Sequence, residues 1–217
     1  MNLEQARTNM VEQQIRTWEV LDQDVLDLLY LVPREQFVPA AHRALAFSDL
    51  EIPIGPGARM WQPKMEARVL QELNVHKTDR VLEVGTGSGY FTALLAPRCA
   101  QVCSVEIDAA LARFGRENLE RHGIDNALLE SGDAARGWER HAPYDVFVLT
   151  GSTPVLPDAL LAQLAPEGRL FAVVGEAPAM SARLVTCTGP GEQRSTDLFE
   201  TVIRPLVNAE RPSRFKF

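Results

Sequence analysis

Three glycines and a nearby carboxylate form the part of the chain best suited to hold a small ligand. Residues 80–90 join an apolar segment to a glycine-rich loop, and a helix is expected over residues 91–96. Gly85, Gly87 and Gly89 leave no side chains between the backbone and a ligand, so amide groups at the start of the helix can approach polar groups closely. The arrangement predicts a nucleotide site.

The spacing in this loop discriminates between classes of nucleotide. A dinucleotide loop, G-x-G-x-x-G/A, needs a small residue at position 90, where Tyr90 stands. The chain reads E-x-G-x-G-x-G instead, with Glu83 ending the preceding strand. This pattern resembles motif I of S-adenosylmethionine-dependent methyltransferases, whose cofactor has no phosphate to bind. The resemblance implies that Glu83 faces the cationic end of the cofactor.

Two further acids follow later strands. Glu106 lies at the end of the next expected strand, about 20 residues past the loop, where an acid pairs with ribose hydroxyls in doubly wound nucleotide folds. Asp133 follows the apolar stretch 127–129, where methyltransferases commonly hold the adenine amino group, and Gly132 allows close approach. The complete set of predicted cofactor-binding residues is Glu83, Gly85, Thr86, Gly87, Ser88, Gly89, Glu106, Ile107, Gly132, Asp133, Ala134 and Thr150.

Alternating helices and strands must position these residues. A helix over residues 108–122 has an acid at its N-cap and Gly123 after its end, as expected of a crossover between parallel strands. The apolar run 144–150 predicts a strand buried on both faces, and a helix over 157–164 and a strand over 170–174 follow. Residues 198–206 are expected to add a last strand. We therefore predict an α/β fold, a Rossmann-like, doubly wound, mostly parallel methyltransferase sheet with an N-terminal helical cap, whose ligand lies at the carboxyl ends of the strands.

The segments outside the sheet suggest three parts. Helical periodicity over residues 3–17 and 24–31 and a proline-punctuated, irregular stretch over 33–63 predict an N-terminal helical cap and lid segment, residues 1–62. A helix over residues 63–73 opens the S-adenosylmethionine-binding core, residues 63–206. Residues 207–217 form a polar C-terminal tail ending in Phe215 and Phe217.

Composition and net charge limit the classes of partner that we expect for this chain. A chain of 217 residues with 46% hydrophobic and 24% charged residues can build a globular core, and a net charge of −7 disfavours a nucleic-acid partner. No apolar run approaches the roughly 20 residues that a membrane helix needs, which leads us to expect a cytoplasmic enzyme without a membrane partner. The three cysteines and four histidines match no C-x-x-C or zinc-ligand spacing, so we predict free thiols and no metal.

Several segments together resemble the protein-L-isoaspartate O-methyltransferase family, from near the first residue to about residue 206. They are residues 10–16 (M-V-E-Q-Q-I-R), 32–39 (V-P-R-E-Q-F-V-P), 52–55 (I-P-I-G), 62–63, 83–96, 103–106, 132–133 with 137–138, and 204–206. The resemblance implies that S-adenosyl-L-methionine methylates the α-carboxylate of L-isoaspartyl residues, leaving S-adenosyl-L-homocysteine. The implied partners are damaged proteins or peptides bearing isoaspartyl residues, whose repair this methylation begins.

The chain departs from the family where the acceptor should bind. After Gly57 the family usually has Gln-Thr-Ile/Val-Ser, and this chain has Ala58-Arg59-Met60-Trp61. The family's serine, placed near the donor methyl and the acceptor, is therefore Trp61, and the catalytic residues stay unassigned. Arg59 and Trp61 are the candidates for substrate contact. Arg59 is either a bidentate grip on a carboxylate or a solvated loop residue; Trp61 is buried packing, an aromatic wall against the sulfonium, or a plug.

These departures leave two functions open. The favoured one is carboxyl O-methylation, because a carboxylate acceptor is already ionised at pH 7 and needs no general base. The alternative is a cofactor-binding homologue that has lost isoaspartyl activity and acts on another acceptor or as an interaction module. Base methylation is disfavoured, since Thr150-Gly151-Ser152-Thr153 stands where an Asp/Asn-Pro-Pro-aromatic tetrapeptide would lie.

Overall fold

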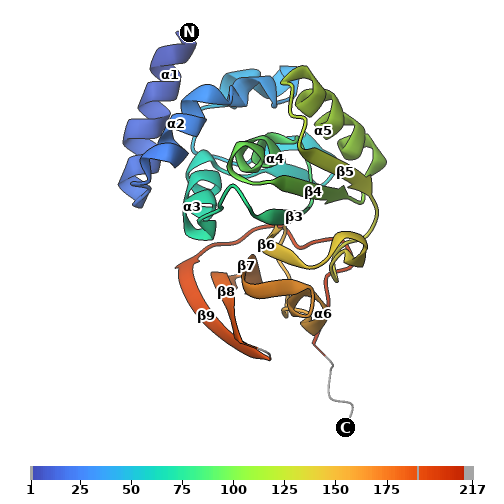
Figure 1. Ribbon diagram of the computed structural model, residues 1–217. Helices are drawn as coiled ribbons and strands as arrows, with labels where there is room; N and C mark the ends of the chain where they lie inside the picture. The colour runs from blue at the N-terminus through green and yellow to red at the C-terminus, as the bar shows by residue number, and fades with distance from the viewer. Residues whose placement is uncertain (1, 190, 213–217) are drawn as a thin grey trace.

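A single large sheet organises the chain (Figure 1). The computed structural model describes residues 2–189 and 191–212, and within them the sheet has seven strands in the order β5-β4-β3-β6-β7-β8-β9. Five strands are parallel: β3 (Arg80–Val84), β4 (Gln101–Glu106), β5 (Ala127–Ser131), β6 (Tyr144–Leu149) and β7 (Leu164–Glu176). The strands β8 (Ala179–Gly189) and β9 (Glu192–Glu200) follow as an antiparallel meander. The predicted Rossmann-like, mostly parallel sheet is confirmed.

Side chains of the central strands alternate between two hydrophobic layers. In β3, Val81 packs into one layer and Leu82 into the other, and in β6 Val146 and Phe147 divide in the same way. All four are buried, because helices or loops cover both faces of a parallel sheet.

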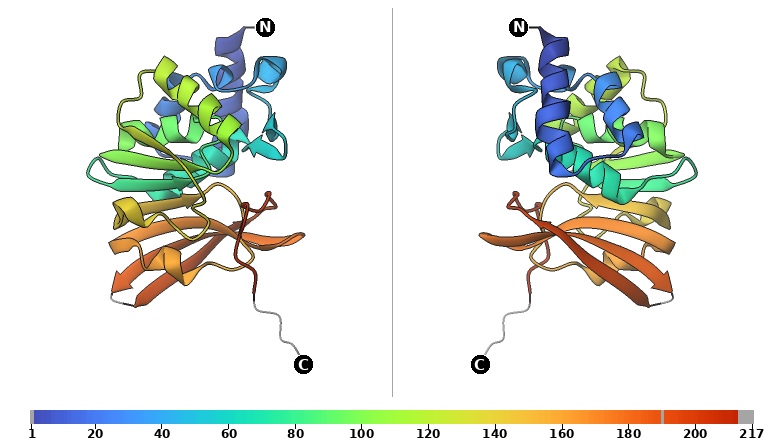
Figure 2. Two further views of the ribbon diagram at one scale, coloured as in Figure 1. Left: turned by 90° about the vertical axis from the view of Figure 1, so that its right-hand side faces the viewer. Right: turned by 90° about the vertical axis from the view of Figure 1, so that its left-hand side faces the viewer.

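Longer helices cover the first face (Figures 1 and 2). They are α3 (Pro63–Leu73), α4 (Tyr90–Leu95) and α5 (Ala109–Arg121), with α1 (Leu3–Met10) and α2 (Gln23–Leu31) packed outside α3. Carboxylate or amide N-caps start three of them, for example Asp108 Oδ1, which accepts from the amides of Ala110 and Leu111 in α5. The first helix continues through a π-helical stretch, Val11–Ile15, and a 3₁₀ turn, Arg16–Trp18. The helices predicted for this face of the sheet are therefore present.

The second face has less helix than the sequence predicts. Only α6 (Asp158–Leu161) forms where a helix was expected over residues 157–164, and Leu164 already belongs to β7. The Gln163 side chain bonds to the backbone of Trp138, Arg136 and Ala159 and so ties the end of α6 to the loop over this face. The predicted extent of this helix was wrong because tertiary contacts end it early.

One connection also differs from expectation. The stretch 33–63 contains 3₁₀ turns at Arg34–Gln36 and Ala40–Leu45 and a small hairpin, β1 (Ile52–Gly55) with β2 (Ala58–Met60), instead of being irregular throughout. Gly57, with φ of 75°, allows the tight turn between these strands.

The last strand was predicted in the wrong place. The sheet ends with β9 at Glu200, and β8 lies where the sequence predicted no strand, since the polar side chains of β8 and β9 leave a weak apolar pattern. Residues 201–212 instead run across the sheet edge, where Leu206 N donates to Ser152 O and Ser152 N donates to Arg204 O. Phe215 and Phe217 of the predicted tail lie outside the described residues. No helix among the described residues combines the length and apolar character needed to cross a membrane.

Candidate active site

A cavity of about 460 Å³ opens at the carboxyl ends of β3, β4 and β6. The structure brings all the predicted cofactor-binding residues to its wall except Gly89. Gly89 lies behind the loop, where a Cβ would stand 3.0 Å from the carbonyl oxygen of Gly115 in α5. Gly89 therefore permits close packing of α4 on α5, and its role in cofactor binding stays a prediction.

The glycine loop leaves no room for side chains at its first position. Gly85 has φ of 98°, and a Cβ there would lie 2.1 Å from Thr150 Oγ1. The Thr150 hydroxyl is placed for hydrogen bonding to the carbonyl oxygens of Val84 and Gly85, at 2.8 and 2.9 Å. The ends of β3 and β6 are thereby joined at the cavity.

Glu106 is held in one orientation at the cavity wall. Its Oε2 accepts from the amide of Gly87 at 2.9 Å, and its Oε1 accepts from the amide of Asp108 at 3.0 Å. The side chain is nearly buried. A carboxylate fixed by two backbone donors still has free lone pairs, so it can accept bonds from neighbouring hydroxyls on a ligand.

Glu83 lies deeper, at the inner end of the cavity. Its Oε2 accepts from the hydroxyls of Thr92 at 2.5 Å and Ser104 at 2.7 Å, while its buried Oε1 has no hydrogen-bond partner in the part of the chain that the structure describes. Burial raises the pKa of Glu83 to about 8, against the opposing hydrogen bonds from Thr92 and Ser104. An unpaired buried oxygen of this kind is suited to a donor or cation supplied by a ligand.

The raised pKa of Glu83 predicts a pH effect on stability. The folded protein keeps a proton that the unfolded chain releases above about pH 4.5, so the free energy of unfolding falls as pH rises toward 8, by at most about 1.4 kcal/mol per pH unit from this group. In Glu83→Gln we expect a shallower fall between pH 7 and 8, measured by urea unfolding without ligand. Identical pH slopes for the variant and the wild type would contradict this prediction.

Asp133 meets a segment that the sequence analysis did not place here. Its Oδ1 accepts from the amide of Ala135, and its Oδ2 accepts from Asn208 Nδ2 at 2.8 Å. Four other residues of the same C-terminal segment line the cavity itself, which Asn208 does not: Arg204, Pro205, Leu206 and Val207. No spacing signal points to them; the resemblance at residues 204–206 was the only indication in the sequence.

Trp61 is packed into the hydrophobic layer and also borders the cavity. Its side chain is 6% exposed, and its ring meets those of Phe91 and Phe171 edge-on, at centroid distances of 5.6 and 6.1 Å. Its carbonyl oxygen accepts from Arg34 Nη2 at 2.5 Å. Of the three readings open for Trp61, the structure supports buried packing.

Arg59 has the opposite environment. It belongs to β2, lines the cavity, and its side chain is 39% exposed. Its Nε lies 4.0 Å from Glu51 Oε2, beyond hydrogen-bond distance.

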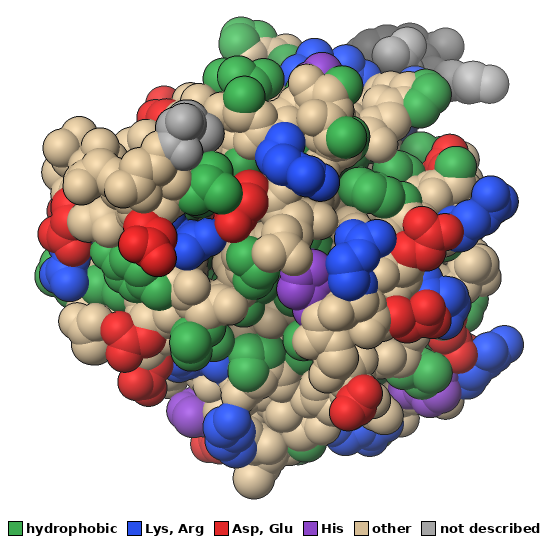
Figure 3. Space-filling view, turned by 90° about the horizontal axis from the view of Figure 1, so that it is seen from above, with side chains coloured by type: hydrophobic (Ala, Val, Ile, Leu, Met, Phe, Trp, Pro, Cys, Tyr) green, Lys and Arg blue, Asp and Glu red, His purple; other side chains and the backbone are tan. Residues whose placement is uncertain are grey.

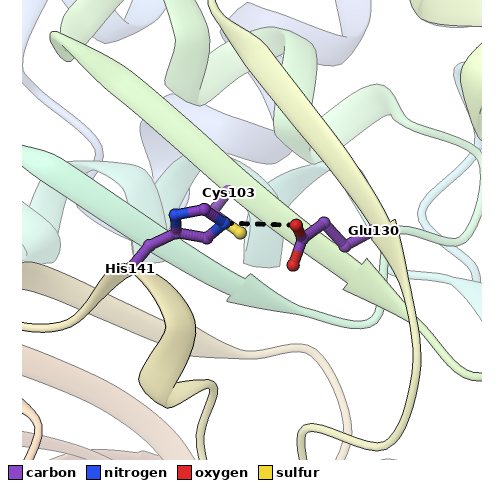
Figure 4. Close-up of side chains that lie close together, drawn as sticks. All are labelled: Cys103, Glu130 and His141. Atoms are coloured by element: carbon purple, nitrogen blue, oxygen red, sulfur yellow. Dashed lines mark hydrogen bonds and ion pairs between the residues drawn. The ribbon is translucent and has the colours of Figure 1, made fainter.

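A second group of polar side chains lies on the second face of the sheet, opposite α3, α4 and α5 (Figure 4). Ligand atoms of Cys103, Glu130 and His141 approach within 4.8 Å of one another, a grouping invisible to sequence spacing. Glu130 is already occupied: Oε1 pairs with His141 Nε2 and Arg140, and Oε2 accepts from the Trp138 indole. Although burial alone would raise the pKa of Glu130, its bonds to His141, Trp138 and Arg140 lower it overall.

These contacts give the group a structural role. Burial raises the pKa of Cys103 to about 12, so its thiol stays protonated. Glu130 fixes Trp138, and the Trp138 ring lies against Gly132, where a Cβ would come within 2.5 Å of Trp138 Cη2. The group therefore shapes the cavity wall beside Asp133.

Comparisons with known proteins agree with this geometry. The family model described as "Protein-L-isoaspartate(D-aspartate) O-methyltransferase (PCMT)" matches residues 5–211. Proteins named protein-L-isoaspartate O-methyltransferase are 39% identical in Pelobacter propionicus, over 96% of this chain and 93% of that protein, and 39% identical in Klebsiella pneumoniae strain 342, over 94% and 97%. A Plasmodium falciparum structure described as that type of methyltransferase in complex with S-adenosyl-L-homocysteine has a TM-score of 0.80, at 22% identity over 95% of this chain and 99% of that one. The structural likeness shows the shared fold.

Proposed function

Because this chain belongs to the protein-L-isoaspartate(D-aspartate) O-methyltransferase family, we propose that it methylates the α-carboxylate of L-isoaspartyl residues in proteins and peptides, with S-adenosylmethionine as donor. One observation supports this most directly: the glycine loop, Glu106 and Asp133 converge on a single cavity. The same cavity borders the hairpin of β1 and β2, which we call the lid hairpin. The proposed partners are proteins damaged by isoaspartyl formation.

The cavity residues fit the proposed cofactor. Gly85 and Gly87 line the cavity without side chains, and Glu106 offers acceptor oxygens for ribose hydroxyls. Asp133 stands at the place proposed for the adenine amino group. The unpaired Oε1 of Glu83 suits the cationic end. When bound, the cofactor supplies an electrophilic methyl group on sulfur.

The protein then contributes to the reaction mainly by positioning the cofactor and the acceptor carboxylate. One carboxylate oxygen of the acceptor forms a bond to the methyl carbon as the carbon–sulfur bond breaks, giving a methyl ester and S-adenosylhomocysteine. The acceptor is ionised at pH 7, so no residue has to remove a proton. Orientation and exclusion of water can therefore supply the rate without the serine that Trp61 replaces.

Cofactor binding is tested by Glu106→Gln. We expect the dissociation constant for S-adenosylhomocysteine, measured by calorimetry, to rise on the order of 10- to 100-fold, because a charge-assisted bond of about 1.5–3 kcal/mol is lost. Glu120→Gln, at an exposed position of α5, is the matched control. Equal dissociation constants for Glu106→Gln and the wild type would remove Glu106 from the site.

Methyl transfer is tested with labelled S-adenosylmethionine, an isoaspartyl peptide and its aspartyl twin. Transfer selective for the isoaspartyl peptide is the expected result. Trp61→Ser belongs in the same assay, with its unfolding measured, since removing this side chain is expected to cost about 3–5 kcal/mol. Trp61→Phe keeps most of the packing. Comparing it with Trp61→Ser therefore distinguishes an effect of this residue on activity from an effect of lost stability.

The buried Trp61 at the serine position supports a second candidate, a cofactor-binding homologue that acts on another acceptor or as an interaction module. Binding of S-adenosylhomocysteine without transfer to the isoaspartyl peptide would favour it. A nucleic-acid acceptor is less well supported: on the face of the described chain shown in Figure 3, basic and acidic side chains are interspersed. A cytoplasmic location is part of the proposal, supported by the free thiols of Cys99, Cys103 and Cys187.

A further inference from the structure

Two arginines from distant parts of the chain meet at the outer end of the cavity. Arg59 lies in β2 of the lid hairpin, and Arg204 lies in the segment after β9; both line the cavity. A Cβ on Gly57, in the hairpin turn, would stand 3.5 Å from Arg204 Nη1, so the Arg204 guanidinium reaches the hairpin. The hairpin and the C-terminal segment lie along the same edge of the sheet (Figure 2).

Carboxylates of the protein do not fully pair with these two arginines. Across residues 2–189 and 191–212, the only ion pair of Arg59 is the 4.0 Å approach to Glu51, and the Arg204 side chain makes no hydrogen bond or ion pair. Burial raises the pKa of Glu51, while Arg59 and Arg204 both act on that carboxyl to lower it. Two guanidinium groups therefore share one carboxylate, in a chain whose net charge is −7.

Five carboxylates also line the cavity, and all accept hydrogen bonds from other groups of the protein: Glu66, Glu83, Glu106, Asp108 and Asp133. The two guanidinium groups make no hydrogen bond within the described residues, so they suit an anion other than the reacting carboxylate. A guanidinium that grips a carboxylate in a bidentate way occupies its lone pairs and withdraws charge from it. The methyl-accepting oxygen needs that charge to attack the donor. The arginines therefore suit an anionic group beside the acceptor carboxylate.

We propose that Arg59 and Arg204 form an anion-binding mouth that selects isoaspartyl segments carrying a second, side-chain carboxylate next to the methyl-accepting one. The proposal rests on the isoaspartyl activity proposed above and names its preferred substrates as acidic segments. It also gives a role to one residue of the departure at Ala58–Trp61, Arg59, a cation where the family usually has a neutral polar residue. Glu51 lowers the net charge of the mouth and moderates this preference.

The test compares two isoaspartyl peptides, both blocked at their termini, with Glu or Gln on each side of the isoaspartyl residue. We expect the wild type to show kcat/KM roughly tenfold higher for the Glu peptide at low salt, and a smaller ratio near 1 M salt, where screening is strong. Arg59→Gln and Arg204→Gln should each reduce the ratio by roughly threefold or more. Arg194→Gln, an exposed arginine on β9, should leave it unchanged.

Two further variants sharpen the result. Glu51→Gln should increase the preference for the Glu peptide, because it removes the carboxylate that faces both arginines. The double variant Arg59→Glu with Arg204→Glu should instead favour a peptide with flanking Lys. A wild-type ratio near one, or a ratio that survives in both Gln variants, overturns the proposal.

Failure of the proposed isoaspartyl methylation can be distinguished from failure of the anion-binding mouth. If neither peptide is methylated, isoaspartyl methylation is overturned, and binding of dye-labelled peptides to the protein saturated with S-adenosylhomocysteine then decides the role of the arginines. Tighter binding of the Glu peptide, lost in the Arg59→Gln and Arg204→Gln variants, supports the anion-binding mouth. Equal binding of both peptides overturns it.

Discussion

Replacing Arg34 by methionine is expected to lower the free energy of unfolding by about 3–5 kcal/mol, because it leaves a buried carboxylate without its partner. Arg34 is 1% exposed, and its Nε donates to Glu66 Oε2 at 2.9 Å. It also donates to the carbonyl oxygens of Ala46 at 2.6 Å and Trp61 at 2.5 Å. The side chain thus connects α3 to two points of the lid segment.

The double variant Arg34→Met with Glu66→Leu separates the charge from the other contacts. Replacing both partners by apolar residues is expected to recover about half of the loss or more. Burial raises the pKa of Glu66 to about 7 even with Arg34 beside it. Without Arg34 that pKa rises further, so the single variant should be least stable, relative to wild type, above pH 7, where Glu66 ionises in the wild type but keeps its proton in the variant. Urea unfolding at pH 6 and pH 8 measures both effects; equal losses for the single and double variants would contradict the charge argument.

Gly85→Ala is expected to disable the cofactor site and to cost about 2–5 kcal/mol of stability. The backbone conformation at φ of 98° strains any residue with a Cβ, by about 1–2 kcal/mol, and the overlap with Thr150 Oγ1 adds a packing cost of about 1–3 kcal/mol. Relief of the overlap would move the loop or Thr150, so affinity for S-adenosylhomocysteine should fall by at least about tenfold, or about 1.4 kcal/mol. Calorimetry and urea unfolding measure the two losses.

Gly123→Ala is the matched control for this substitution. Gly123 follows α5 with φ of 63°, and nothing lies within 4 Å of the position its Cβ would take. It should lose about 1–2 kcal/mol of stability from strain alone and keep its affinity for the ligand. Adding Thr150→Ala to Gly85→Ala should restore part of the stability. If it restores none, the overlap with the Thr150 side chain is not the cause.

The cofactor end of the site was predictable because its signals are local. Gly85 and Glu106 each follow a buried apolar strand, and parallel strands end at a common edge, so spacing along the chain implied that they are neighbours in space. The helix over residues 108–122 was equally readable, since its N-cap acid and terminal glycine stand beside it in the sequence. That Gly89 packs on α5 instead of lining the cavity was not predictable, because a glycine that serves packing and one that borders a cavity look alike in sequence.

The contribution of the C-terminal segment was not predictable in the same way. Arg204 reaches the cavity, and Asn208 reaches Asp133 at its wall, only because residues 201–212 turn back across the sheet after β9, and no spacing records that path. The Glu130 group likewise combines side chains from separate elements. The helix expected over 157–164 was shortened by contacts of Gln163 with a distant loop.

By itself, then, the sequence determined the sheet class, the glycine loop and the acids at the strand ends, because hydrophobic period and strand-end position are properties of neighbouring residues. Only the tertiary structure decided that Trp61 is buried at the cavity wall, that the Glu83 carboxyl is buried with a raised pKa, and that Arg59 and Arg204 line one cavity. Burial, charge balance and the meeting of distant segments depend on the whole folded path of the chain, since each is set by atoms far away in sequence.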